Sequence, residues 1–219
     1  MRAAEWGVDY RARLRELPVR PPVQPGEIAA KIAPSPPETP EPFENIFADF
    51  ERDIAPGMTH WQHPRFFAYF PSNSAPASLV AEHLVNAIGA VCMLWQTSPA
   101  ATELETRAVD WLRQAFGLPD AFRGCIQDTA STATLAAVLV MRERALGFTG
   151  NKTGLTGAPR LRVYCSAEAH SSIDRAIWFS GIGADNLVRI PIKGPLRGAE
   201  PEALRKLIAD DIAAGFKPA

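Results

Sequence analysis

One histidine, His170, falls where a side chain could contact a ligand. It follows a short apolar run, 161–165, whose valine and tyrosine favour a buried strand. Ser171, Ser172 and Asp174 come next and can cap a following helix. His170 therefore lies at or near the carboxyl end of a strand, the edge of open α/β sheets where ligands bind. A structural histidine in a strand-to-helix turn explains this stretch equally well.

A second candidate for ligand contact is the segment 127–132, which opens a predicted helix over 133–146. Small hydroxyl residues at a helix start can hydrogen-bond a phosphate at the positive helix end. Ordinary capping by Thr129 or Ser131 is the more frequent reason for such residues. From these residues alone, both interpretations stand.

An aromatic segment, 59–76, carries five aromatic side chains among prolines and small polar residues. The prolines exclude a regular helix, so the rings must be presented on a loop. Such loops seal the edge of a core or line an apolar pocket. Composition alone favours sealing of the core.

The elements around these segments follow an α/β pattern. Apolar periodicity predicts helices over 1–17, 43–54, 79–94, 99–115 and 201–212, and a second strand over 187–192. The helix over 79–94 is nearly uncharged and is expected to be buried on most sides. The proline-dense stretch 18–42 is expected to run extended. Helices alternating with strands indicate a parallel sheet, and two strands are too few to complete one.

Composition narrows the class of protein. The 219 residues are 47% hydrophobic with a formal net charge of -1, which gives no indication of a nucleic-acid partner or a membrane surface. Because no apolar run spans a bilayer and no signal peptide is evident, we expect a cytoplasmic protein. Cys92, Cys125 and Cys165 are expected to be buried, reduced thiols, and the histidine spacing predicts no metal site.

These segments together resemble the aromatic L-amino acid decarboxylase branch of the group II pyridoxal phosphate-dependent decarboxylases. The resemblance covers nearly the whole chain, in the family's order. Its most specific parts are the runs 66–71 (Phe-Phe-Ala-Tyr-Phe-Pro) and 102–105 (Thr-Glu-Leu-Glu). The other matching residues are Thr59-His60-Trp61 with His63-Pro64, Ser98-Pro99-Ala100, Gln127 with Ala130-Ser131, and Ala169-His170-Ser171-Ser172, and the last two pieces would be weak if they stood alone.

The resemblance implies a fold and a cofactor. It implies the pyridoxal phosphate-dependent transferase-like fold (fold type I), α/β and incomplete in this chain. Residues 1–75 would form an N-terminal helical arm and aromatic loop that intertwine in a homodimer. Residues 76–219 would begin the large cofactor-binding domain. Pyridoxal 5'-phosphate would be the cofactor and an aromatic amino acid the substrate.

The resemblance also implies roles for particular residues. Ala130 and Ser131 match positions that hold the cofactor phosphate. His170 matches the catalytic histidine that stacks on the cofactor's pyridine ring. Substrate-binding positions are matched by Trp61, Tyr69, Phe70, Pro71 and Ser72 in the aromatic loop, and by Val91 and Met93, which would reach the pocket of the other subunit.

Several features depart from the family pattern. The Schiff-base lysine, the aspartate partner of the pyridine nitrogen and the mobile-loop tyrosine all lie beyond the match. We therefore expect a carboxyl-terminal remainder, or a second chain, to carry the lysine. Asp128 stands where relatives often have glycine, and Arg123-Gly124-Cys125 stands where they often have a glycine run. An aromatic aldehyde synthase, another amino acid decarboxylase and a non-catalytic dimerisation chain remain as alternatives.

Overall fold

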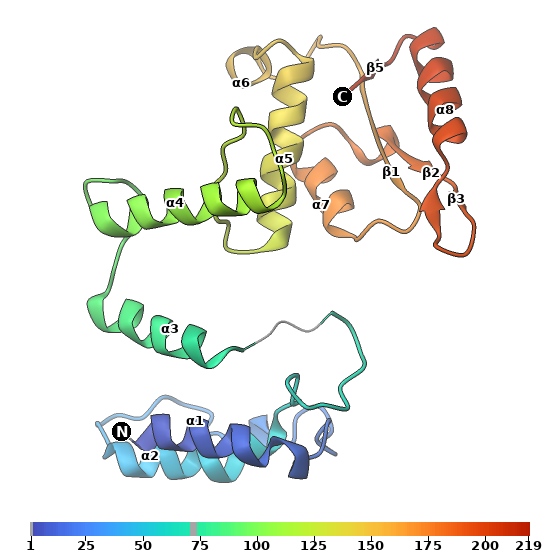
Figure 1. The fold of residues 1–219 in the computed structure, drawn as a ribbon. Helices are drawn as coiled ribbons and strands as arrows, with labels where there is room; N and C mark the ends of the chain where they lie inside the picture. The colour runs from blue at the N-terminus through green and yellow to red at the C-terminus, as the bar shows by residue number, and fades with distance from the viewer. Residues whose placement is uncertain (1, 71–73) are drawn as a thin grey trace. The chain divides into compact units, whose positions relative to one another are not determined.

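The computed structural model describes residues 2–70 and 74–219. They form two compact units, Met1–Ala90 and Val91–Ala219. Figure 1 shows a first unit of helices and extended chain and a second unit of mixed helices and strands.

The first unit begins with two helical segments joined by the proline-dense arm. α1 (Arg2–Arg13) continues into a 3-10 turn (Leu14–Glu16), and the arm forms one short turn (Ala29–Lys31) before α2 (Phe43–Asp49). α2 runs on through a π turn (Phe50–Ile54) and a 3-10 turn (Ala55–Gly57), where Pro56 and Gly57 end it as predicted. The helices predicted over 1–17 and 43–54 are thus confirmed.

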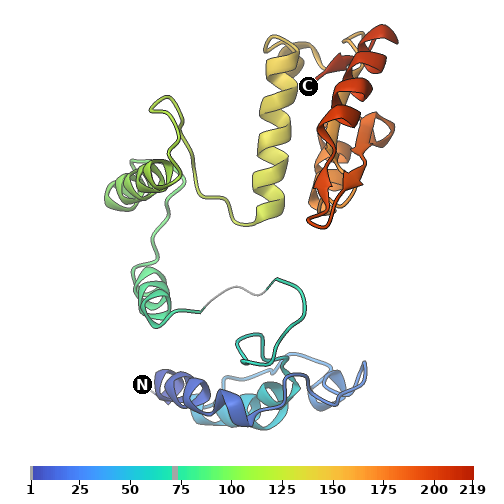
Figure 2. The ribbon, with the colours of Figure 1, turned by 45° about the vertical axis from the view of Figure 1, so that its right-hand side comes forward.

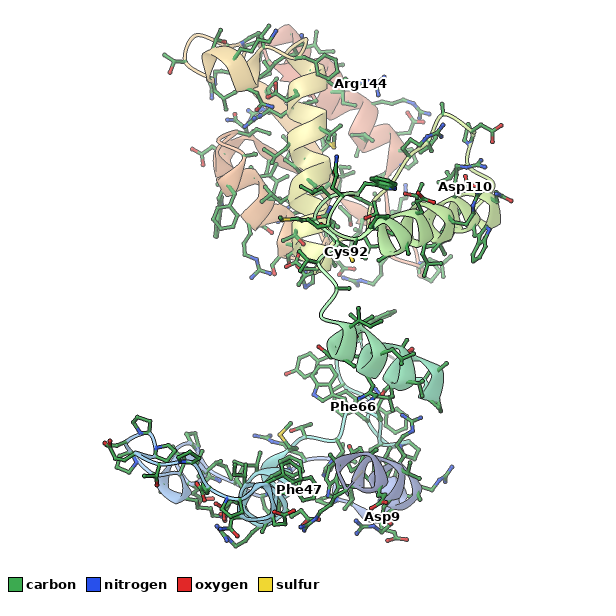
Figure 3. All side chains as sticks on the ribbon, turned by 90° about the vertical axis from the view of Figure 1, so that its left-hand side faces the viewer. Asp9, Phe47, Phe66, Cys92, Asp110 and Arg144 are labelled. Atoms are coloured by element: carbon green, nitrogen blue, oxygen red, sulfur yellow. The ribbon has the colours of Figure 1, made fainter. Side chains whose placement is uncertain are left out.

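Aromatic rings join α1 to α2 and its continuation. Trp6 stacks on Tyr10 with ring centroids 5.2 Å apart and meets Phe50 edge-on at 5.0 Å. The Arg2 guanidinium lies 4.6 Å from the centre of the Phe47 ring. Figure 3 labels Phe47 on α2 and Asp9 on α1. Phe47 is 8% exposed. These contacts hold the two helices side by side, because aromatic pairs add specific geometry to the burial of area.

The third helix of this unit differs from its prediction. α3 (Pro76–Ile88) ends six residues before the predicted limit of Leu94, because Gly89 adopts the left-handed conformation (φ 65°) that stops a helix. Its apolar side chains are not buried: Val80 is 61% exposed and Ile88 is 76% exposed. The apolar composition predicted the helix correctly and its burial wrongly, since no described residue of the first unit covers these side chains.

The second unit contains the predicted α/β pattern. Its helices are α4 (Pro99–Ala115), α5 (Ala130–Ala145), α6 (Gly150–Thr153), α7 (Ser172–Phe179) and α8 (Pro201–Ala213), and its strands are β1 (Leu161–Ser166), β2 (Leu187–Ile190), β3 (Ile192–Lys193), β4 (Gly198–Ala199) and β5 (Lys217–Pro218). A 3-10 turn (Ala184–Asn186) precedes β2. The main sheet has the order β2-β1-β5 with parallel pairing throughout.

Two strand predictions need correction. The strand predicted over 187–192 stops at Ile190, and Ile192 pairs antiparallel with Ala199 in a separate β3-β4 hairpin. Pro191 separates the two pieces, because proline cannot donate to a ladder. The sequence also gave no sign of β5, whose Lys217 N–H donates to the Arg160 carbonyl at 2.8 Å. A two-residue strand is too short to show alternation.

The core of the second unit lies on one face of β1. Side chains of β1 alternate between buried and half-buried. The buried cluster consists of Val138, Leu161, Val163, Ala176, Ile177 and Ile182, so α5 and α7 cover this face. On the other face, Tyr164 and Arg162 contact Asp211 of α8 at 2.8 and 3.1 Å. β1 is therefore covered on both faces, as a parallel strand requires.

Candidate functional site

His170 lies just beyond the carboxyl ends of β1 and β2. The Ala167 N–H donates to the Ile190 carbonyl at 2.9 Å, and the Ala169 N–H donates to the Ser166 carbonyl at 3.0 Å. These bonds tie the turn that carries His170 to the last residues of both strands. The predicted position at the carboxyl edge of a parallel sheet is confirmed.

The His170 imidazole is exposed and held through one nitrogen. Its Nδ1 accepts the Ser172 N–H at 3.1 Å, and the Ser172 hydroxyl lies 3.0 Å from the same atom. Since Nδ1 acts as an acceptor, the proton of the neutral ring is placed on Nε2. Ser172 is 7% exposed and starts α7, so the anchor is rigid. The arrangement leaves Nε2 and the flat faces of the ring available to a ligand.

An ion pair between β2 and α7 supports the turn that carries His170. The Arg189 guanidinium of β2 pairs with Asp174 in the first turn of α7. The same guanidinium contacts Cys165 Sγ at 3.0 Å and the Ser166 carbonyl at 3.3 Å. Burial raises the pKa of the Cys165 thiol, which favours its protonated form. Sequence reasoning missed Arg189, and the polar residue in the middle of an apolar strand was the available signal.

The start of α5 offers a second binding feature. Thr129 caps the helix, with its hydroxyl accepting the Thr132 N–H at 3.2 Å. Ala130 and Ser131 form the first turn, whose backbone N–H groups have no acceptor within the helix itself. The predicted capping is confirmed, and it leaves donors open at the positive helix end. The helix starts three residues before its predicted limit because Thr129, not a later residue, is the cap.

The two features lie at the same end of the second unit. α5 runs antiparallel to β1, so its start lies toward the carboxyl ends of the strands (Figures 1 and 2). A planar ring with an anionic group could contact an imidazole face and the open N–H groups of a helix start. That combination is chemistry suited to a phosphorylated aromatic cofactor.

Two acids of the run 102–105 each hold a segment next to α4, one that precedes α4 and one that precedes α5. The Glu105 carboxylate accepts the Ile126 N–H at 2.7 Å, and the Glu103 carboxylate accepts the Trp95 indole N–H at 2.8 Å. α4 thereby fixes the chain on both its sides. This gives a structural role to the Thr-Glu-Leu-Glu run, which sequence reasoning recognised as specific without assigning a role to it.

In the first unit, the aromatic loop is anchored by two buried histidines. Tyr10 Oη lies 2.9 Å from His60 Nδ1, and His63 Nδ1 accepts the Arg65 N–H at 3.0 Å. Burial, and then the nearby His63, lower the pKa of His60. His60 and His63 are 6% and 4% exposed. The loop is therefore fixed at its base.

The rings beyond this base are exposed. Trp61 stacks against Tyr69, with centroids 5.6 Å apart and planes inclined by 21°. Tyr69 is 87% exposed and Phe70 is 98% exposed, so sealing of the core is the wrong interpretation for them within this chain. Tyr69 also has φ 57°, a conformation that non-glycine residues seldom adopt. Pro71 and Ser72 lie outside the described residues.

Val91 and Met93, the other predicted pocket residues, are exposed. Val91 and Met93 are 53% and 78% exposed and lie in a turn closed by the Thr97 hydroxyl, which is 2.6 Å from the Val91 carbonyl. Trp61, Tyr69 and Phe70 belong to the first unit, whereas Ala130, Ser131 and His170 belong to the second. Their union in one site stays a prediction.

The three cysteines differ in their burial. Cys165 is buried, whereas Cys92 and Cys125 are exposed, so burial of all three is wrong. Over residues 2–70 and 74–219, no three His, Cys, Asp or Glu side chains gather as metal ligands. None of the helices in these ranges has the length and apolar content needed to cross a bilayer.

The sheet edge and its helix start define an α/β domain of a cofactor-dependent enzyme class. Residues 25–219 match the pyridoxal-dependent decarboxylase conserved domain, and the chain belongs to this family. The predicted family is confirmed. Pyridoxal phosphate is the family's cofactor, and a rice decarboxylase (Oryza sativa TDC) solved with pyridoxal phosphate and tryptamine matches the chain with a TM-score of 0.91 at 33% identity.

Relatives of known activity place the chain more closely. It is 36% identical to an aromatic-L-amino-acid decarboxylase of Catharanthus roseus over 99% of the chain and 44% of the relative. It is 37% identical to a phenylacetaldehyde synthase of Petunia hybrida over 96% of the chain and 42% of the relative. The solved tryptophan decarboxylase of Catharanthus roseus, in complex with L-tryptophan, matches with a TM-score of 0.91, 36% identity, and coverage of 99% of this chain and 47% of that one.

The chain thus spans a little under half the length of the relatives that it matches. The incomplete fold of the pyridoxal phosphate-dependent transferase type, with a helical N-terminal part, is confirmed.

Proposed function

We propose that this chain is the amino-terminal part of a pyridoxal phosphate-dependent decarboxylase that converts an aromatic L-amino acid to its amine and carbon dioxide. One observation carries the proposal. In a chain of this family, the exposed His170 imidazole and the open first turn of α5 lie toward the same edge of the sheet. A rigidly held ring and a set of free N–H donors are what a phosphorylated pyridine needs.

The residues of this site fit the cofactor. Ala130 and Ser131 would hold its phosphate through the backbone N–H groups of the first turn, and Ser131 is half-buried there. His170 would lie against its pyridine ring. When bound, pyridoxal phosphate supplies the electron sink for cleavage of the carboxylate bond.

His170 would be the catalytic residue contributed by this chain. Its Nδ1 bond to the Ser172 N–H fixes the plane of the ring, and Nε2 keeps a proton that it can hold at the reacting face. The Arg189–Asp174 pair would keep the turn in register with the strands. These contacts orient the imidazole before any ligand arrives, which lowers the cost of binding.

The substrate pocket would take its aromatic lining from the first unit. Trp61, Tyr69 and Phe70 present exposed ring faces that could bury an aromatic amino acid side chain. Exposed apolar residues of α3 and of the turn after it favour a second subunit as their cover. We therefore propose a cytoplasmic homodimer, with Pro71, Ser72, Val91 and Met93 also at the pocket. A carboxyl-terminal remainder, or a second chain, would contribute the lysine.

An aromatic aldehyde synthase is the second candidate activity, and another amino acid decarboxylase of the family is a third. The chain is 37% identical to the Petunia synthase, whereas its identity to relatives named as decarboxylases runs from 36% to 40%, so identity does not separate the two chemistries. A non-catalytic dimerisation chain is the alternative outside enzymology. It would dimerise and hold no cofactor.

The test joins this chain to its carboxyl-terminal remainder and supplies pyridoxal phosphate and aromatic amino acids. We expect pyridoxal absorbance and release of amine, and both should be lost in His170→Ala. His83→Ala is the matched control, because His83 is an exposed histidine on α3, outside the unit that carries Ala130, Ser131 and His170. Aldehyde with peroxide in place of amine would establish the synthase. Dimers without cofactor or product would establish the dimerisation chain.

A further inference from the structure

Asp128 stands directly before the cap of α5, at the mouth of the proposed phosphate site. The Thr132 hydroxyl, one turn into the helix, donates to Asp128 Oδ1. The same hydroxyl accepts the Thr129 N–H at 3.2 Å. The carboxylate is therefore hydrogen-bonded to the side chain that forms the capping box, which holds it at the first turn while it stays exposed to solvent.

Asp128 is charged at neutral pH. The Thr132 hydrogen bond is the main cause that lowers the pKa of its carboxyl, with smaller contributions from the N–H groups of Thr129 and of Asp128 itself. Partial desolvation opposes these effects. An anion at the start of a helix is also favoured by the helix dipole. The positive end of α5 thus already carries a full negative charge.

We propose that Asp128 is a tethered anion that competes with the cofactor phosphate for the first turn of α5, so that the chain holds phosphate more weakly than it would with a neutral residue at this position. This inference rests on the proposed function. The phosphate would bring up to two further negative charges to within a few ångströms of the carboxylate. At such separations Coulomb repulsion in a watery environment weakens binding about tenfold.

The coupling between the Asp128 carboxylate and a bound phosphate acts in both directions. If the carboxylate lowers phosphate affinity, bound phosphate must raise the pKa of Asp128 by the same coupling free energy. A tenfold effect on affinity corresponds to a shift of about one pKa unit. A residue with a purely structural role in capping would show neither effect.

The experiment uses this chain joined to its carboxyl-terminal remainder and compares it with the same protein carrying Asp128→Asn, which removes the charge and keeps the shape. Glu202→Gln is the control, since Glu202 is an exposed acid in the first turn of another helix, α8. Inorganic phosphate and pyridoxal phosphate are titrated into each protein, at low and at high salt. We expect Asp128→Asn to bind both ligands about tenfold more tightly at low salt and less so at high salt, with Glu202→Gln unchanged.

In the same samples, the pKa of the Asp128 carboxyl is measured by carbon-13 NMR with and without saturating phosphate. An upward shift of about one unit is expected. Equal affinities for wild type and Asp128→Asn, with an unmoved pKa, would overturn the proposal and leave the cofactor site intact. Weaker binding in Asp128→Asn would also overturn it, by making Asp128 a supporting group. If no protein in the set binds either ligand, the phosphate site itself fails, and the proposed function fails with it.

Discussion

His170 Nδ1 and the Ser172 backbone N–H are joined by a hydrogen bond of 3.1 Å across the start of α7. The bond makes one ring nitrogen an acceptor and so determines the tautomer. We expect nitrogen-15 NMR to find the neutral ring protonated at Nε2. A ring protonated at Nδ1 would contradict this geometry.

The Ser172 hydroxyl can be tested apart from the backbone bond. Ser172→Ala keeps the N–H and removes the hydroxyl that lies 3.0 Å from Nδ1. We expect the free energy of unfolding to fall by about 1 kcal/mol, because the side chain is buried and its partner loses a hydrogen bond. Ser171→Ala is the control, since Ser171 is exposed and makes no side-chain capping bond. Equal effects from both substitutions would exclude this role for Ser172.

Loss of the Arg189–Asp174 pair should loosen the turn that carries His170. Arg189→Met keeps most of the apolar stem but removes the contacts to Asp174, Cys165 and the Ser166 carbonyl. Since the pair is only partly buried, we expect a loss of about 1 kcal/mol in the free energy of unfolding. The sharper measurement is amide hydrogen exchange, which should quicken at Ala167 and Ala169.

A matched comparison is available on α8. Arg205→Met breaks an ion pair with Glu202 between two exposed side chains. Exposed pairs contribute little, so this variant should leave both stability and exchange at the His170 turn nearly unchanged. If Arg189→Met likewise leaves the exchange of Ala167 and Ala169 unaltered, the turn is held by its backbone bonds alone.

The parts of the fold that could be predicted from the sequence are those determined by residues close together along the chain. The valine and tyrosine of the apolar run 161–165 identified β1 (Leu161–Ser166). Thr129 is a strong capping residue, which placed the start of α5 within three positions. Proline and glycine signals ended α2 and α8 near their observed limits. These signals are local, so they can be recognised without knowledge of the tertiary structure.

The rest depended on contacts between distant segments. β5 exists only because Arg160 and Arg162 offer carbonyls to Lys217 and Ala219. The support of His170 by Arg189 requires β1 and β2 to pair in register, with Cys165 opposite Arg189. Burial failed as a prediction for α3, because apolar composition reports a need for cover and does not identify what supplies it. The joint site of both units could be inferred only from the resemblance to a family.

The base of the aromatic loop should weaken as the pH falls. His60 is buried beside His63 and next to the Tyr10 hydroxyl. Arg13 and Glu51 line the same cavity, of about 560 Å³. Because the folded pKa of His60 is lowered, the unfolded state binds the proton more readily. The free energy of unfolding should therefore decline as pH falls below about 6.5, the ordinary histidine value, toward the lowered pKa.

Two substitutions check this origin. His60→Gln should flatten the pH dependence of unfolding, followed by tryptophan fluorescence of Trp6 and Trp61, whereas His83→Gln, at an exposed position, should leave it unchanged. Tyr10→Phe should cost about 1 kcal/mol at neutral pH through loss of its hydrogen bond. If the free energy of unfolding falls equally toward acid pH in wild type and in His60→Gln, a group other than His60 causes the decline.

The second unit should instead weaken at alkaline pH. The Tyr164 hydroxyl is partly buried and donates to Asp211 at 2.8 Å, and burial first, then this bond, raise the pKa of Tyr164 to about 12. Between the ordinary tyrosine value of about 10 and this raised value, the unfolded state loses its proton first, so the free energy of unfolding falls as pH rises.

Tyr164→Phe should remove the last step in the ultraviolet absorbance of tyrosinate and cost about 1–2 kcal/mol at neutral pH. Tyr69→Phe, at a side chain 87% exposed, should keep both that last step and the stability of the unit. If the step survives in Tyr164→Phe, the tyrosine of β1 is not the group that Asp211 keeps protonated.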